Sequence, residues 1–245
     1  MKTCVVIPAR FKSSRFPGKP LTLIKGKAMI LRVAELSAKA VGKLNVFIAT
    51  DNFKINNYVK NAGFNSIMTN TNNLTGTDRV AEASKNLKYD IYVNVQGDEP
   101  LINPDDILEA IKFKKKYPSF VINSFCFLNN EEDPMNKNIP KVVTDEKNNL
   151  IYISRSVIPA SKKETNSYKY KKQVCIYAYN KEELSCFYNF GRKSKVESIE
   201  DIEILRFFEL GINIKMYEAK TKTIAVDIPS DVEKVESYLE KNYKC

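Results

Sequence analysis

The feature that most constrains the fold is a regular alternation of short apolar runs with segments of helical periodicity. Runs typical of buried strands lie at residues 4–7, 46–49, 67–68, 91–95 and 120–128. Helical patterns separate them at residues 29–40, 52–62, 77–86 and 103–111. Strands that alternate with helices join into parallel sheets covered on both faces, so the pattern predicts an α/β fold. We expect a mainly parallel, mixed sheet flanked by helices.

The alternation becomes less regular beyond residue 130. Shorter apolar runs predict strands at residues 142–144, 150–154, 174–179, 214–217 and 224–226. The lysine-rich stretch 160–172 has few apolar residues, which is typical of a solvated loop. Ser230 is a suitable cap for a final helix. Since no repeat or linker divides the chain, we expect one domain over residues 1–245 with an inserted arm at about 130–190.

The chain contains no histidine and no tryptophan. The absence of histidine excludes Ser-His-Asp and Cys-His nucleophiles, imidazole metal ligands and imidazole proton shuttles. Catalysis must therefore use carboxylates, lysine, hydroxyls, thiols, backbone amides or a metal held by oxygen. The net charge of +10 permits an anionic ligand such as a nucleotide, a phosphosugar or a nucleic acid, without selecting one.

The five cysteines form no CxxC pair, and Cys4, Cys126 and Cys175 lie in apolar runs. This pattern indicates buried thiols in a reducing compartment. The sequence begins MKTCVVIPAR, which lacks the apolar stretch of a signal peptide, and no apolar run reaches 18 residues. We expect a cytoplasmic protein without a membrane span.

A basic loop follows the first predicted strand directly. Residues 8–20 include Arg10, Lys12, Arg15 and Lys19, together with two serines. Ligands of open α/β sheets bind at the carboxyl ends of strands, where cations and loop amides can hold a polyphosphate. The loop matches neither GxxxxGK[ST] nor GxGxxG, and an exposed basic loop without a ligand is the alternative.

Two aspartates also follow apolar runs, Asp98 in NVQGDEP and Asp227 in AVDIP. Magnesium commonly takes one or two protein carboxylates together with phosphate oxygens, so this pair predicts a Mg²⁺ site. The alternatives are an acidic turn at Asp98 and a turn or helix cap at Asp227. A third polar loop, LTGTDR at residues 74–79, could bind a base or ribose, or could simply cap a helix.

Several longer motifs occur in a characteristic order: VVIPARFKSSRFPGKPL from Val5, IATD at 48–51, TGTDR at 75–79 and VNVQGDEP at 93–100. Together they resemble the 3-deoxy-manno-octulosonate (Kdo) cytidylyltransferase family, also called CMP-Kdo synthetases. The similarity continues through residues 141–143, 153–159, 176–179, 197–206 and 226–227, and so covers nearly the whole chain. It implies a nucleotidyltransferase fold of the GT-A-like, Rossmann-like type.

The resemblance implies a magnesium-dependent transfer of CMP from CTP to the anomeric hydroxyl of a 3-deoxy-2-keto sugar acid, Kdo or a close relative. Pyrophosphate would leave, and the CMP-sugar would serve cell-surface glycans such as lipopolysaccharide or capsule. Arg10, Arg15 and Lys19 would bind the triphosphate and stabilise the leaving group. Asp98 and Asp227 would hold Mg²⁺, with Asp98 also essential to catalysis.

The resemblance also assigns the two substrate pockets and a homodimer formed through the inserted arm. The residues it assigns to the nucleotide are Pro8, Ala9, Arg10, Lys19, Thr75, Gly76 and Gln96. The residues it assigns to the sugar acid are Arg155, Tyr177 and Glu200. For Tyr177, a core tyrosine without a substrate role is the alternative.

The chain departs from the family pattern on the sugar side. In place of the family's Arg-His, Gly, His and Gln, it has Lys172-Gln173, Cys175, Ser198 and Ile204. Polar sites reject analogues that leave buried groups unpaired, so such changes can redirect specificity. One hypothesis retains CTP but replaces Kdo by an amino-Kdo or a nonulosonic (sialic-type) acid. The other treats the changes as neutral.

Two further classes of function compete with this interpretation. A non-catalytic nucleotide-binding protein on the same fold would bind CTP without releasing pyrophosphate. A basic nucleic-acid binder would place aromatic residues among its cations, as Tyr168 and Tyr170 stand among lysines. Because no nucleic-acid motif occurs, we expect no nucleic-acid partner.

Overall fold

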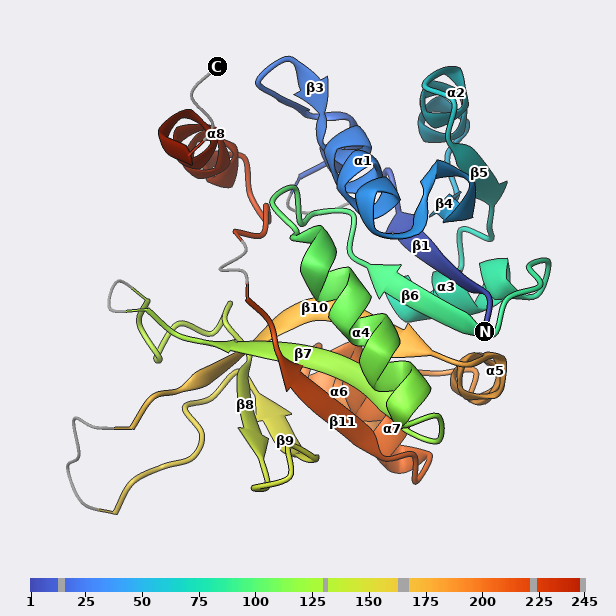
Figure 1. Ribbon diagram of the computed structural model, residues 1–245. Coiled ribbons are helices and arrows are strands. Elements are labelled where there is room, and N and C mark those ends of the chain that lie inside the picture. Colours follow the sequence, from blue (N-terminus) through green and yellow to red (C-terminus); the bar gives the residue numbers. More distant parts are fainter. Residues whose placement is uncertain (13–15, 130–131, 163–167, 221–223, 243–245) are drawn as a thin grey trace.

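The computed structural model describes residues 1–12, 16–129, 132–162, 168–220 and 224–242 (Figure 1). Its main sheet has nine strands. The order across the sheet is β11 (Ile214–Glu218), β7 (Val121–Phe127), β10 (Lys171–Tyr179), β6 (Ile91–Val95), β1 (Thr3–Ala9), β4 (Val46–Thr50) and β5 (Asn65–Met68). The remaining strands, β8 (Lys141–Thr144) and β9 (Leu150–Ser154), extend the sheet from the start of β10.

The predicted mixed sheet is confirmed. β1 pairs in parallel with β4 and β6, β4 pairs in parallel with β5, and β11 pairs in parallel with β7. β10 runs antiparallel to β6 and β7 and joins the two parallel groups. The carboxyl ends of β1, β4 and β6 therefore lie along one edge of the sheet.

Helices cover both faces of this sheet. The first face carries α1 (Met29–Val41), α2 (Phe53–Asn61) and α4 (Pro104–Lys116). The opposite face carries α3 (Gly76–Ser84), α5 (Lys181–Asn189), α6 (Lys195–Glu200) and α7 (Arg206–Glu209). Successive residues of β1 alternate between the two cores, with Val5 and Ile7 in one and Cys4 and Val6 in the other.

The last helix, α8 (Ser230–Asn242), packs beside the small hairpin of β2 (Leu23–Ile24) and β3 (Lys27–Ala28). A third apolar cluster joins them through Ile24, Met29, Val226 and Val235. None of the helices in the described residues combines the length and the apolar composition needed to cross a bilayer.

Three local predictions need correction. Residues 224–226 are not a strand: Val226 is buried, and its backbone donates its N–H to the carbonyl of Asp98 and accepts the Lys19 side chain at its own carbonyl. The lysine-rich loop ends before residue 171, because Lys171 and Lys172 begin β10. Cys175 is only half-buried, whereas Cys4 and Cys126 are buried as expected.

Close backbone packing fixes the edge at which β1 and β6 end. A Cβ atom at Gly97 would lie 2.9 Å from the carbonyl oxygen of Pro8, so a larger residue would push the two strand ends apart. Gln96 also donates its backbone N–H to the carbonyl of Cys175 on β10. The segment that follows β6 is thus held on both sides.

A buried ion pair ties α4 to α5. The Nζ atom of Lys114, whose side chain is 1% exposed, lies 2.6 and 2.7 Å from the two carboxylate oxygens of Glu183. It also donates to the carbonyls of Pro118 and Phe120, at 3.0 and 2.6 Å, just before β7. Burial lowers the pKa of Lys114 and raises the pKa of Glu183, and their mutual attraction opposes both shifts.

Replacing Lys114 by methionine should destabilise the fold by about 3–5 kcal/mol, because Glu183 would remain buried without its cation. Chemical denaturation of the variant measures this loss. Lys112→Ala, on the same helix, is the control: Lys112 pairs with Glu109 on the exposed face, and its loss should cost under about 0.5 kcal/mol. A loss below about 1 kcal/mol in Lys114→Met would contradict the structural role.

Candidate active site

The predicted chemical residues gather at the edge where β1 and β6 end. They come from four segments that lie far apart in the sequence: the loop after β1, the start of α3, the loop after β6, and residues 226–227. Arg10 is exposed directly after β1. Arg15, the other predicted arginine of the first loop, lies outside the described residues.

Lys19 joins three of these segments. Its Nζ atom lies 2.6 Å from Oδ2 of Asp98 and donates to the carbonyl of Val226 at 2.8 Å. The N–H of Val226 donates to the carbonyl of Asp98 at 2.9 Å, which draws Asp227 to the same edge. Gly18, in a left-handed conformation with φ of 73°, turns the chain into the short 3₁₀ helix η1 (Lys19–Leu21). Lys19 and Asp98 are therefore in contact, and Asp227 directly follows Val226, which bonds to both.

The donor atoms at this point fit a magnesium ion bound with a nucleotide. Asp98 and Asp227 carry carboxylates on two segments whose backbones are joined by the hydrogen bond from Val226 to Asp98. Within the described residues, no group of three or more His, Cys, Asp or Glu could enclose a metal. Magnesium is commonly held by one or two carboxylates together with phosphate oxygens and water, so such a group is not required.

The residues expected to contact the base are also close together. A Cβ atom at Gly76 would lie 2.9 Å from Nε2 of Gln96 and 3.3 Å from Cγ of Pro8. Gly76 thus leaves room for the Gln96 amide beside the end of β1. Thr75 caps α3 by accepting the N–H of Asp78 at 3.2 Å, as the capping interpretation of this loop predicted. Ala9 is buried at the end of β1.

Sequence reasoning assigned no role to Glu203, in the 3₁₀ helix η3 (Glu203–Leu205), yet its carboxyl reaches the centre of this group. Oε1 accepts Nε2 of Gln96 at 2.9 Å, and Oε2 accepts the N–H of Thr77 at 3.0 Å. Burial raises the pKa of Glu203, while hydrogen bonds from Thr77 and Thr75 act against that rise. Its partners lie 107 and 126 residues away, so no local sequence signal could have revealed the contact.

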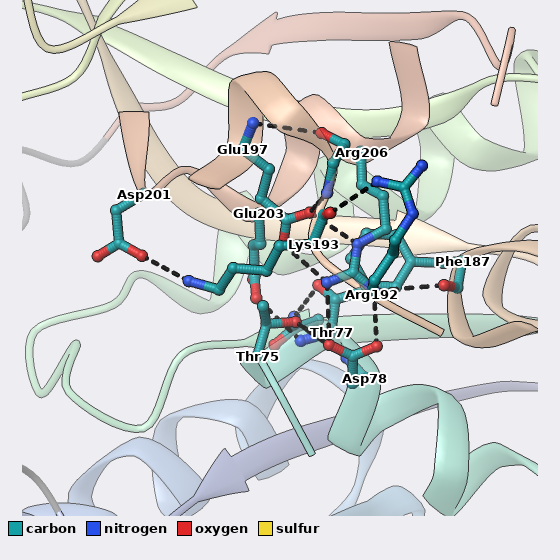
Figure 2. Close-up of polar contacts among 12 residues, drawn as sticks. Thr75, Thr77, Asp78, Phe187, Arg192, Lys193, Glu197, Asp201, Glu203 and Arg206 are labelled. Carbon is teal, nitrogen blue, oxygen red and sulfur yellow. Dashed lines mark hydrogen bonds and ion pairs between the residues drawn. The ribbon is translucent and has the colours of Figure 1, made fainter. Parts of the chain in front are cut away.

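One further arginine of the same segment anchors the start of α3 (Figure 2). The guanidinium of Arg206 is fully buried and donates to Asp78 at 2.7 and 3.1 Å and to Glu197 at 2.7 and 2.8 Å. A fifth bond reaches the carbonyl of Phe187 at 3.3 Å. Although burial alone would lower the pKa of Arg206, its bonds to Glu197 and Asp78 raise it.

Arg79, next to Asp78, is fixed in a similar way. Its guanidinium donates to Asp51 at 2.9 Å and to Thr69 at 2.5 Å. Burial lowers the pKa of Arg79, and the Asp51 carboxylate opposes this shift. The TGTDR and IATD motifs, which lie about two dozen residues apart, are thus joined by an ion pair between Arg79 and Asp51. The Arg79 side chain is buried and does not lie on the surface.

Two of the residues expected on the sugar side, Arg155 and Glu200, are in contact. The Glu200 carboxylate accepts the N–H of Arg155 at 2.9 Å and the hydroxyl of Ser154 at 2.6 Å. The Arg155 guanidinium donates to the carbonyls of Lys137, Glu200 and Asp201. In this arrangement Arg155 orders the loops around α6.

Tyr177, the third such residue, is 2% exposed in the second core. Its hydroxyl accepts Nε2 of Gln173 at 3.2 Å, and its ring stacks with that of Tyr179. Burial raises the pKa of Tyr177 well above its ordinary value. The contacts are those of a core tyrosine, with its polar end directed toward Gln173.

The four departures from the family pattern occupy different environments. Gln173 and Cys175 are half-buried on β10, and Cys175 lies beside Gln96. Ile204 is fully buried in the second core, and Ser198 is exposed on α6. Gln173 bonds to Tyr177, and the carbonyl of Cys175 accepts the N–H of Gln96.

Comparisons with known proteins agree with this arrangement. A family model described as Cytidylyltransferase matches residues 4–219. The 3-deoxy-manno-octulosonate cytidylyltransferase of Escherichia coli is 35% identical over 238 residues, which are 97% of this chain and 96% of that protein. The 8-amino-3,8-dideoxy-manno-octulosonate cytidylyltransferase of Shewanella baltica is 36% identical over 247 residues, with 98% and 99% coverage.

A solved structure gives the same result in three dimensions. The structure of CMP:2-keto-3-deoxy-manno-octonic acid synthetase complexed with CTP superposes with a TM-score of 0.90 at 36% identity, covering 98% of this chain and 99% of that chain. The predicted nucleotidyltransferase fold is thereby confirmed. From the family match over residues 4–219 and the nearly complete coverage of its relatives, the chain belongs to the cytidylyltransferase family.

Proposed function

We propose that this protein transfers CMP from CTP to the anomeric hydroxyl of a 3-deoxy-2-keto sugar acid, with release of pyrophosphate. The observation that carries the proposal is the convergence of Lys19, Asp98 and Asp227 at the edge where Gly76 and Gln96 lie. We assign this step to the cytoplasm, where the CMP-sugar would serve synthesis of lipopolysaccharide, capsule or another cell-surface glycan.

In the proposed reaction, the sugar hydroxyl oxygen forms a bond to the α-phosphorus of CTP. The bond from this phosphorus to the pyrophosphate oxygen breaks, and the hydroxyl proton is released. Arg10 and Lys19 would bind the phosphates and stabilise the charge that develops on pyrophosphate. Bound Mg²⁺, held by Asp98 and Asp227, would polarise the phosphate and lower the pKa of the hydroxyl. This chemistry needs no histidine.

Kdo and 8-amino-Kdo are the two leading candidates for the sugar-acid substrate. Relatives of similar identity carry the names of Kdo and of 8-amino-Kdo cytidylyltransferases, so overall similarity does not separate the two. Gln173 and Cys175 lie near Gln96 and Tyr177, where a change of side chain would alter the space and hydrogen bonding offered to the sugar. A nonulosonic acid is the third candidate.

Pyrophosphate release with CTP and Mg²⁺ against a panel of Kdo, 8-amino-Kdo and nonulosonic acids tests the proposal. We expect release with at least one Kdo-type acid. Kdo as by far the best substrate would make the four departures neutral, whereas preference for another acid would make Gln173 and Cys175 the leading specificity determinants. CTP binding without release on any acid would favour a non-catalytic nucleotide-binding protein.

Asp98→Asn and Asp227→Asn should each lower kcat by about a hundredfold or more at saturating Mg²⁺, because each removes a carboxylate from the metal site. Steady-state kinetics with varied Mg²⁺ measures the effect. Asp105→Asn, an exposed aspartate at the start of α4, is the matched control and should keep wild-type rates. Near-normal kcat in both variants would refute the metal assignment.

We also propose that the chain acts as one domain and forms a homodimer through the arm at residues 130–190. The arm carries Met135, Ile151 and Tyr168 with side chains that are 71%, 56% and 45% exposed. Burial of such exposed apolar side chains against a second copy would be favourable. Light scattering across a dilution series should give twice the mass of one chain; a monomer at every concentration would reject this interface.

A further inference from the structure

Glu203 connects two parts of the candidate site that are remote in sequence. One carboxylate oxygen accepts the backbone N–H of Thr77 at 3.0 Å, in the first turn of α3. The other accepts Nε2 of Gln96 at 2.9 Å, in the loop after β6. Both partners adjoin Gly76, since a Cβ there would touch the Gln96 amide.

These contacts define which way the Gln96 amide points. A backbone N–H can only donate, so the contact with Thr77 requires an acceptor oxygen at Glu203. The second oxygen of the same carboxylate is also an acceptor, and it selects the amide nitrogen of Gln96 as its partner. The carbonyl oxygen of Gln96, Oε1, is consequently the end of the amide that does not bond to Glu203.

The position of Gln96 makes this orientation relevant to substrate. Gln96 is half-buried, two residues before Asp98, and its amide lies against Gly76 near Pro8. We propose that Glu203 is a positioning residue that orients Gln96 so that Oε1 accepts a hydrogen bond from a donor group of the substrate. The inference rests on the proposed function and extends it to a residue outside the predicted set.

Two substrate groups have the required chemistry. The 4-amino group of cytosine is a donor, whereas the corresponding oxygen of uracil is an acceptor, so an oriented Oε1 would discriminate CTP from UTP. A hydroxyl or an amino group of the sugar acid can also donate. The shared chemistry is a hydrogen-bond donor, and kinetic constants for each substrate separate the two sources.

Glu203→Gln is the decisive variant, because it keeps the size of the side chain. The new amide can still accept the Thr77 N–H through its oxygen, but it then presents an NH₂ group to Gln96. The Gln96 amide must reverse to accept from it, which turns a donor toward the substrate. The fold keeps its hydrogen bonds while the polarity that the site offers to the substrate is inverted.

We expect Glu203→Gln to lower kcat/KM by about tenfold to a hundredfold, since two donors would face each other at the substrate. If the partner is cytosine, the Kd of CTP rises, the preference for CTP over UTP falls, and the KM of the sugar acid stays constant. If the partner is the sugar acid, its KM rises and the Kd of CTP stays constant. Glu209→Gln, at an exposed position that ends α7, is the control and should behave as wild type.

The double exchange Glu203→Gln with Gln96→Glu provides the rescue. The carboxylate would now lie at position 96, accept from the amide at 203 and present its second oxygen to the substrate. We expect it to recover most of the lost kcat/KM. Failure of this rescue, or a single variant within twofold of wild type in all constants, would overturn the inference. Absence of turnover by the wild-type protein on every acid would instead count against the proposed function. In that case the Kd of CTP for the wild type and for Glu203→Gln would still test whether Gln96 bonds to cytosine.

Discussion

The buried guanidinium of Arg206 is the interaction on which the geometry of the site depends. It donates five hydrogen bonds, to Asp78, Glu197 and the carbonyl of Phe187, and a guanidinium has five N–H groups. Two carboxylates and one cation can share a buried position only when such complete pairing compensates their desolvation. Because Asp78 lies two residues after Gly76, this pairing fixes the loop that contacts Gln96. Glu197 belongs to α6, which ends at Glu200, so the same cation also orders the side of the site that carries Arg155.

Much of the fold could be predicted from the sequence because the strands are short, apolar and separated by amphipathic helices. The same reasoning placed Arg10 and Asp98 at one edge of the sheet: Arg10 directly follows β1, Asp98 lies three residues after β6, and these two strands are parallel. The cap at Thr75 could also be predicted, because a capping side chain bonds to a backbone N–H only two or three residues away. Each of these successes depends on local chemistry or on a general rule about strand ends.

The remaining features depend on contacts that periodicity does not encode. Antiparallel β10 has the same apolar pattern as a parallel strand, so its direction is invisible in the residues. Val226 is as apolar as a strand residue, yet its backbone bonds to Asp98 and to the Lys19 side chain outside any strand, which brings Asp227 to the edge that carries Asp98. Glu203 looked like an ordinary residue of a helical segment, and its role emerges only when η3 packs against α3. Charged residues that act across more than 100 positions require the folded structure for their interpretation.

The structure also separates the two halves of the site in a way that bears on substrate choice. On the side proposed to bind the nucleotide, Lys19 pairs with Asp98, and Gln96 bonds to Glu203 beside the closely packed Gly76. On the other side, Gln173 bonds to Asn123 and Tyr177. These groups are neutral, so replacing one of them leaves no unpaired charge in the core. A substitution of Arg206 or Asp78 leaves an unpaired ion in the core, whereas a change at Gln173 or Cys175 alters only local shape and hydrogen bonding. Exchanges of Gln173 or Cys175, on the side proposed for the sugar acid, are therefore less costly to the fold than exchanges of the buried ions at α3, on the side proposed for the nucleotide.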